Sequence, residues 1–133
     1  MLKLYTDAAT KGNPGPSAAG LLIVDGAHTV ERGLALGNMD NHSAEFAAAI
    51  AGLKLLVQLG YAGQNVTLIS DSQVLIDALG NGYSKHHPAA LDQLQTLADA
   101  FPMLIPTWQN DHRNKGAHTL ALRKLAEIER EDG

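Results

Sequence analysis

The chain has 133 residues, 45% hydrophobic and 18% charged, so it has the length of one domain and enough apolar side chains for a core. It contains no cysteine, which excludes disulfides and thiolate zinc sites and makes a reducing cytoplasm the expected location; no apolar stretch approaches the ~20 residues of a membrane span. The formal net charge of −4 is not that of a typical nucleic-acid-binding protein, which has a basic surface. Either the partner is not a polyanion, or bound metal ions supply the positive charge at the site.

The first part of the chain predicts three antiparallel strands. Apolar and polar residues alternate over residues 2–7, which predicts a strand that ends at Asp7. A turn cluster at 12–16 precedes a continuous apolar run at 18–24. Asp25 and Gly26 then predict a hairpin to a returning strand at 29–36.

The pattern then changes to the period of helices. Hydrophobic residues spaced by three and four predict a helix with Ser43 as its N-cap and Gly60 at its end. A short apolar strand at 66–70 leads to Asp71 and to a helix that stops at Gly80, with Val74 on its apolar face.

The last third predicts two more helices around an edge strand. A helix begins at Pro88, a strand at 104–108 is marked as an edge by Pro106, and apolar residues from 120 to 128 indicate a final helix. The order β-β-β-α-β-α-α-β-α predicts an α/β fold, a mixed sheet flanked by helices, in one domain spanning residues 1–133.

Three acidic residues occupy positions where a sheet could bring them together. Asp7 ends the first predicted strand, Asp71 ends the fourth, and Glu45 lies in the first turn of the long helix. Singly, each has a structural explanation, because Asp71 could cap a helix and Glu45 could complement a helix dipole. A cluster of all three would raise their pKa values unless a hard cation such as Mg²⁺ or Mn²⁺ were bound.

Four segments follow one another along the chain: residues 5–8 (YTDA) with the turn 12–16 (GNPGP), residues 41–48 (NHSAEFAA), residues 70–73 (SDSQ) and residues 108–121 (WQNDHRNKGAHTLA). In this order they resemble the successive motifs of type 1 ribonuclease H, and the resemblance extends from residue 1 to about residue 125. It implies the ribonuclease H-like fold, a five-stranded mixed sheet flanked by helices.

The resemblance also implies an activity: metal-dependent endonucleolytic hydrolysis of the RNA strand of RNA–DNA hybrids, leaving 5′-phosphate and 3′-hydroxyl ends. Two divalent ions, Mg²⁺ or Mn²⁺, would be held by Asp7, Glu45 and Asp71, with Asp7 shared by both ions. No organic cofactor and no membrane partner are expected. Substrate contacts are expected from Asn13 in the glycine-rich turn and from three further polar residues, Asn41, His42 and Gln73. For these three, ordinary loop or cap hydrogen bonding is the structural alternative.

The last motif departs from the family pattern. His118 stands four residues after Asn114, where the family has an aspartate. Because a neutral imidazole suits Mn²⁺ better than Mg²⁺, we expect His118 to bind the second ion or hold one of its ligands and to shift the preference toward Mn²⁺; a partly exposed helix residue is the alternative. His112 falls where some relatives carry a mobile histidine near the leaving group, but chance placement on a polar loop explains it equally well. Asp111 replaces an arginine found in many relatives.

The segment between Gly80 and Phe101 carries Lys85 as its one lysine or arginine, so the basic protrusion of larger family members is expected to be absent. Two alternatives to hybrid cleavage remain open: a catalytically silent ribonuclease H-like module that binds nucleic acid or a protein, and a different nuclease of the superfamily. His86 and His87 are interpreted as solvated loop residues rather than a zinc site.

Overall fold

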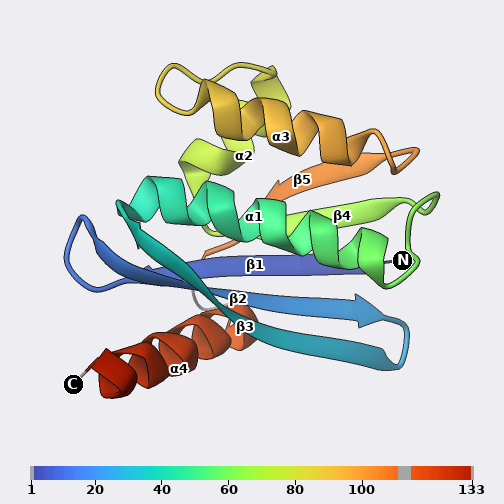
Figure 1. The fold of residues 1–133 in the computed structure, drawn as a ribbon. Coiled ribbons are helices and arrows are strands. Elements are labelled where there is room, and N and C mark those ends of the chain that lie inside the picture. The colour runs from blue at the N-terminus through green and yellow to red at the C-terminus, as the bar shows by residue number, and fades with distance from the viewer. Residues whose placement is uncertain (1, 111–114, 133) are drawn as a thin grey trace.

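The computed structural model describes residues 2–110 and 115–132, which are organised around one five-stranded sheet (Figure 1). Its strand order is β3-β2-β1-β4-β5. The first three strands pair antiparallel, whereas β1 with β4 and β4 with β5 pair parallel, so the predicted mixed sheet is confirmed. The strands are β1 (Leu2–Thr10), β2 (Gly15–Asp25), β3 (His28–Met39), β4 (Val66–Ser70) and β5 (Leu104–Trp108).

Four helices cover the two faces of this sheet in the described chain. Figure 1 shows α1 (Asn41–Gln58), with α2 (Gln73–Asn81) and α3 (Pro88–Ala98) beside it, on one face. The last helix, α4 (Lys115–Asp132), lies on the other face against β1, β2 and β3. The predicted order of elements is therefore confirmed. Residues 82–87 alone separate α2 from α3, as expected for a chain without a basic protrusion.

The prediction that the first strand ends at Asp7 is wrong. β1 continues to Thr10, because β2 keeps pairing with it as far as Thr10 opposite Ser17. Asp7 consequently lies inside a strand, opposite Gly20, rather than in a turn. The alternation of apolar and polar residues stops at Asp7, because its carboxylate belongs to a polar site rather than to the apolar core.

Two predicted helix boundaries also need correction. Asp40, not Ser43, is the N-cap of α1: its side chain accepts a hydrogen bond from the backbone N–H of Ser43 at 2.8 Å. Glu45 therefore lies in the second turn of α1 rather than the first. Gly80 lies inside α2, which ends at Asn81 and is capped by Gly82, whose φ of 69° is the left-handed conformation that favours glycine.

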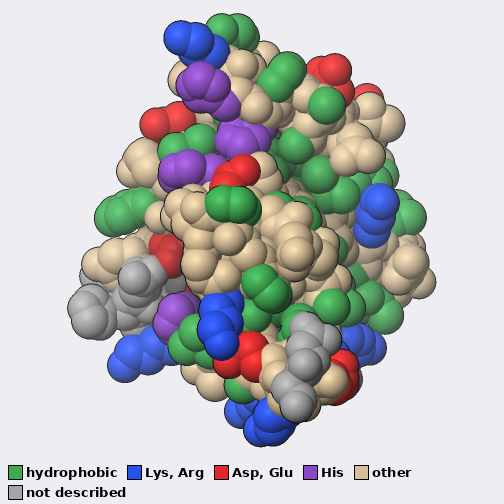
Figure 2. Space-filling model, turned by 60° about the vertical axis from the view of Figure 1, so that its left-hand side comes forward, with side chains coloured by type: hydrophobic (Ala, Val, Ile, Leu, Met, Phe, Trp, Pro, Cys, Tyr) green, Lys and Arg blue, Asp and Glu red, His purple; other side chains and the backbone are tan. Residues whose placement is uncertain are grey.

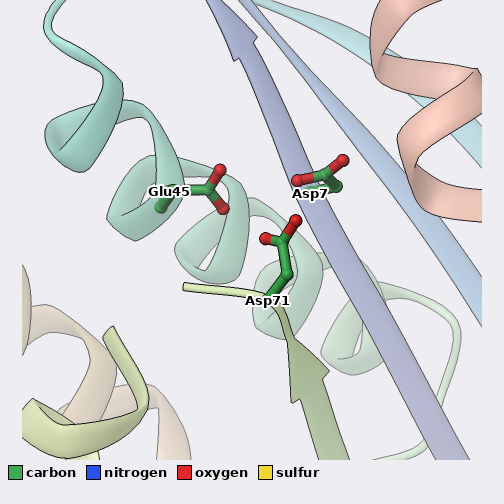
Figure 3. A group of neighbouring side chains, drawn as sticks. All are labelled: Asp7, Glu45 and Asp71. Atoms are coloured by element: carbon green, nitrogen blue, oxygen red, sulfur yellow. The ribbon is translucent and has the colours of Figure 1, made fainter. Parts of the chain in front are cut away.

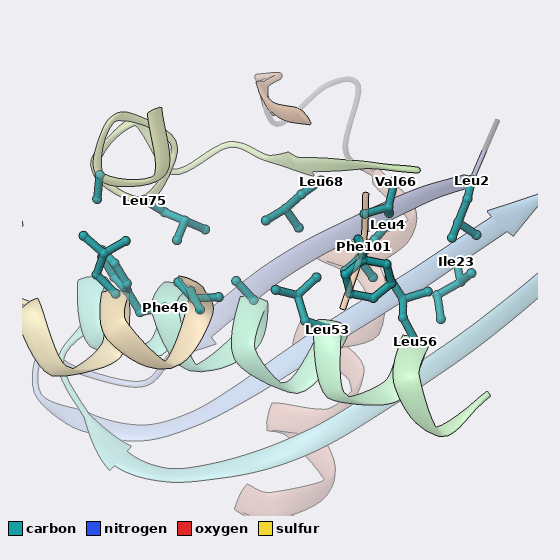
Figure 4. Packing of buried hydrophobic residues seen from close by; sticks show 14 residues of the cluster. Leu2, Leu4, Ile23, Phe46, Leu53, Leu56, Val66, Leu68, Leu75 and Phe101 are labelled. Carbon is teal, nitrogen blue, oxygen red and sulfur yellow. The ribbon is translucent and has the colours of Figure 1, made fainter. Parts of the chain in front are cut away.

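The main core lies between the sheet and the α1 face (Figure 4). Gly52 permits close packing there, since a Cβ at this position would lie 2.9 Å from the side chain of Leu4. No helix within the described ranges is both long enough and apolar enough to cross a membrane. The largest fully buried side chains of the main core include Leu4, Ile23, Phe46, Leu53, Leu56, Val66, Leu68, Leu75 and Leu94.

Candidate active site

The three predicted carboxylates converge at one end of the sheet (Figure 3). One oxygen each from Asp7, Glu45 and Asp71 lies within 4.8 Å of the others. The strand register explains this, because β1 and β4 pair as far as Tyr5 opposite Ile69 and both aspartates lie two residues further on. Glu45 approaches from α1, as Figure 3 shows. The predicted geometric cluster is therefore confirmed.

Burial makes this cluster electrostatically costly without a cation. Asp7 is 2% exposed, and its burial raises the pKa of its carboxyl, although a hydrogen bond from His118 opposes the rise. Burial, followed by the negative charges of Asp7 and Asp71, raises the pKa of Glu45 to about 9. Glu45 Oε2 is buried and has no hydrogen-bond partner among the described residues. Three carboxylates with an unpartnered buried oxygen are a donor set that fits a divalent cation.

Asp71 is not the N-cap of the helix that follows it. Ser72 has that role, since its hydroxyl accepts a hydrogen bond from the backbone N–H of Leu75 at 3.2 Å. The backbone N–H of Ser72 in turn donates to Ser70 Oγ at 3.0 Å. The structural explanation of Asp71 as a capping residue is therefore wrong. Because serine is as favoured an N-cap as aspartate, Ser72 was the other capping candidate in the sequence.

His118 of α4 lies directly against the cluster. Its Nδ1 is 2.7 Å from Asp7 Oδ2, while 43% of its side chain is exposed. Close packing of α4 on β2 makes this contact possible: a Cβ at Gly20, opposite Asp7, would overlap the backbone carbonyl of Ala117. A glycine at position 20 thus lets α4 rest on the strand backbone and brings the next helix residue to Asp7.

A groove with a volume of about 360 Å³ adjoins the carboxylates. Three of the predicted substrate residues, Asn41, His42 and Gln73, line it together with Glu45 and Asp71. Val74 also lines this groove and is 42% exposed, so its predicted place on a buried helix face is wrong. The apolar side of α2 is instead formed by its buried residues, Leu75 and Ala78.

Asn13, the fourth predicted substrate residue, has a structural contact. Its side-chain oxygen accepts a hydrogen bond from the backbone N–H of Asn41 at 3.0 Å, at the start of α1. This bond ties the turn between β1 and β2 to the helix that carries Glu45. The side-chain amide of Asn13 still has its N–H groups for a substrate contact, which stays a prediction.

A second pocket of about 360 Å³ shares His42 and Val74 with the groove and is also lined by His86 and His87. Figure 2 shows histidine side chains gathered on the upper part of this face of the molecule. His87 stacks on Phe46 with ring centroids 4.6 Å apart. Within residues 2–110 and 115–132 these histidines do not belong to a group of three or more metal-ligating side chains. His86 is exposed, as expected of a solvated loop residue, whereas His87 is half-buried.

Two features of the site escaped sequence reasoning. Gly20 carried no motif, and only the packing of α4 reveals its role. The sequence predicts Trp108 only as a residue of the last strand. In the structure its indole N–H also donates to the backbone carbonyl of Asp71 at 3.0 Å, across 37 residues of sequence. His112 lies outside the described residues, as do Asp111 and Asn114.

Comparison with known proteins agrees with this arrangement. Residues 5–124 match the family described as "Reverse transcriptase-like". The chain is 35% identical over 127 residues to the putative hydrolase EbsB of Enterococcus faecalis, covering 94% of both chains. It is 37% identical over 86 residues to a ribonuclease H of Syntrophus aciditrophicus, covering 65% of this chain but only 47% of that protein. The solved RNase H1 of Halobacterium salinarum superposes with a TM-score of 0.87 at 29% identity, covering 95% of this chain and 98% of the other. The chain therefore belongs to the type 1 ribonuclease H family of the ribonuclease H-like superfamily.

Proposed function

We propose that the protein is a metal-dependent endonuclease that hydrolyses the RNA strand of RNA–DNA hybrids and leaves 5′-phosphate and 3′-hydroxyl ends. The observation that carries this proposal is the convergence of Asp7, Glu45 and Asp71 within 4.8 Å, at the end of a sheet with ribonuclease H topology. The functions for which its relatives are named, ribonuclease H and putative hydrolase, support the same chemistry.

Asp7, Glu45 and Asp71 would hold the divalent ions, for which we propose two Mg²⁺ or Mn²⁺. Held by these carboxylates, divalent ions would supply Lewis-acid activation of a water molecule and neutralisation of charge on the scissile phosphate. The protein's own contribution is to keep the three carboxylates close together in spite of their mutual repulsion. Burial of Asp7 and Glu45 also limits the water that would screen them from a bound cation.

His118 takes the place of a fourth carboxylate in this proposal. When Asp7 is ionised it can only accept, so the proton of the contact resides on His118 Nδ1 and, in the neutral ring, Nε2 keeps its lone pair. In this contact the ring would hold Asp7 in position for the second ion; released from Asp7, it would bind that ion through a ring nitrogen. Direct ligation would favour Mn²⁺ over Mg²⁺, because imidazole is a better ligand for the softer ion.

The hybrid would lie along the groove beside the carboxylates. Asn41, His42 and Gln73 would contact its minor groove, where the 2′-hydroxyls distinguish RNA from DNA, and Asn13 would contribute from the neighbouring turn. The role of His112 near the leaving group, a single domain spanning residues 1–133, and a cytoplasmic location complete the proposal as predictions from the sequence.

Cleavage of a labelled RNA–DNA hybrid in Mn²⁺ tests the proposal, with Asp7→Asn as the diagnostic variant. We expect the rate to fall by at least about 10²–10³-fold, since removing one preorganised electrostatic group from an active site has an effect of this size. The matched control is Asp92→Asn, an exposed position on α3, which should cleave at the wild-type rate. Cleavage that persists in Asp7→Asn would contradict the assignment, and the chemistry of the product ends would check the bond that is broken.

One observation favours a second candidate, a catalytically silent module that binds nucleic acid or a protein. His118 contacts Asp7 where the family pattern has an aspartate, so one metal-ligating carboxylate is missing. Binding of the hybrid by the wild-type protein without cleavage in either Mg²⁺ or Mn²⁺ would establish this alternative.

A further inference from the structure

The residue that joins β4 to α2 is held from the neighbouring edge strand. Asp71 belongs to neither element, yet its backbone carbonyl accepts a hydrogen bond from the indole N–H of Trp108 at 3.0 Å. The backbone N–H of Gln109, the residue after β5, donates to the carbonyl of Ser70 at 3.0 Å. Two successive carbonyls before α2 are therefore fixed by two successive residues of the edge-strand segment.

Burial does not account for the bond made by Trp108. The residue is 47% exposed and ends the edge strand β5, so its N–H could bond water at little cost. The bond to Asp71 instead restricts the peptide unit that follows the Asp71 Cα. Since that peptide plane and the Cα–Cβ bond share one atom, fixing it limits where the carboxylate can point.

We propose that Trp108 is a positioning residue for the carboxylate site, acting through the backbone of Asp71. This inference rests on the proposed metal-dependent function, in which Asp71 is a metal ligand. Trp108 touches neither substrate nor reacting atoms in this role. Because the bond already restricts Asp71 before an ion binds, less conformational freedom is lost on binding.

The alternative is that Trp108 only covers the end of the sheet with its ring. Trp108→Phe separates the two roles, because it keeps an aromatic ring and removes the N–H donor. Ile105→Val is the matched control: it trims another exposed apolar side chain of β5, which lies opposite Thr67, whereas Trp108 lies opposite Ser70, next to Asp71.

Calorimetric titration of the metal-free protein with Mn²⁺ is the deciding measurement. Trp108→Phe should bind Mn²⁺ about three- to tenfold more weakly than wild type, the loss expected for one hydrogen bond, while Ile105→Val binds as wild type. In hybrid cleavage at a fixed Mn²⁺ concentration, kcat should fall and KM for the hybrid should stay unchanged. Equal Mn²⁺ affinity in Trp108→Phe and wild type, or equal weakening in both variants, would overturn the inference.

A second readout needs no variant of Trp108. Because the chain has one tryptophan, its ¹H–¹⁵N spectrum contains a single indole signal, which reports on the surroundings of this N–H. That signal should shift as Mg²⁺ is added to wild type and should stay still in Asp71→Asn. An indole signal that does not respond while Mg²⁺ binds would count against the link.

Failure of the inference can be told apart from failure of the proposed function. If wild type binds Mn²⁺ and Asp71→Asn does not, while Trp108→Phe equals wild type, only the positioning role is rejected. If wild type and Asp71→Asn bind Mn²⁺ equally, the metal site itself is rejected and the role of Trp108 falls with it.

Discussion

On the face of the sheet covered by α1, large side chains such as Leu4, Phe46 and Leu53 fill the space between helix and strands. On the face covered by α4, Gly20 meets the backbone of Ala117 with no side chain between them. The first face gains its stability from buried apolar area. The second brings two backbones close together, and this close approach places the ring of a helix residue within hydrogen-bond distance of Asp7.

The difference teaches how one sheet can carry both a core and a charged site. Alternation along β1 directs Leu4 and Thr6 toward α1, where both lie near Gly52, and directs Asp7 to the opposite face. Large apolar residues around Asp7 would leave its carboxylate without a partner, at a considerable cost in free energy. Small residues on the α4 face avoid that cost, because they leave room for His118.

The contrast between the two faces is tested most directly by adding a methyl group where α4 touches β2. We expect Gly20→Ala to lower the free energy of unfolding by about 1–3 kcal/mol, the usual cost of overpacking, because the new Cβ overlaps the carbonyl of Ala117 and α4 must move. Urea denaturation measures this loss. The matched control is Gly33→Ala, also beneath α4: its Cβ would lie 3.1 Å from Lys124 Cβ and 3.4 Å from the Leu120 carbonyl oxygen, tight contacts without the overlap found at Gly20, so it should cost less. Equal costs for the two variants would show that α4 does not depend on a glycine at position 20.

The repulsion within the carboxylate cluster gives the next effect. Because the pKa of Glu45 is raised from 4.5 to about 9, the folded protein keeps a proton that the unfolded chain releases across this range. The metal-free protein should therefore lose stability as the pH rises through it. Glu45→Gln should abolish most of this loss, and at about pH 8 it should unfold with a free energy higher than wild type by at least about 1.4 kcal/mol, the equivalent of one pKa unit.

Urea denaturation in a metal chelator at about pH 5 and about pH 8 measures the effect. The matched control is Glu131→Gln, an exposed position on α4, which should follow wild type at both values. Mn²⁺ added at the higher pH should stabilise wild type, since the bound cation offsets the repulsion among the ionised carboxylates. A metal-free wild-type protein that is more stable at the higher pH would show that the cluster does not hold a proton on Glu45.

The smallest effect concerns metal preference. His118→Asp restores a carboxylate beside Asp7, so the ratio of Mn²⁺-supported to Mg²⁺-supported cleavage should fall by a few-fold, because a carboxylate suits Mg²⁺ better than imidazole does. The matched control is His28→Asp, the same exchange at an exposed position of β3. The idea fails if wild type and His118→Asp show the same metal preference.

Local patterns in the sequence determined the order of all nine elements of the described chain and the bounds of β4 and β5. They also pointed to Asp7, Glu45 and Asp71 as one group, once two things were assumed: that the first and fourth strands pair, and that the long helix packs on the sheet beside them. Hydrophobic periodicity is a short-range property, and it predicts elements well wherever one face is consistently apolar. It failed at Asp7 and at the two helix ends, where a polar site and capping hydrogen bonds interrupt the pattern.

Only the tertiary structure decided how the site is supported. The contact between His118 and Asp7 joins residues 111 apart in sequence, and the bond from Trp108 to Asp71 joins residues 37 apart. Neither contact follows from the spacing of residues along the chain, because each depends on how closely one element packs on another. Gly20 shows the reason most clearly: the absence of a side chain has no meaning in a strand pattern until a helix backbone is found resting on it.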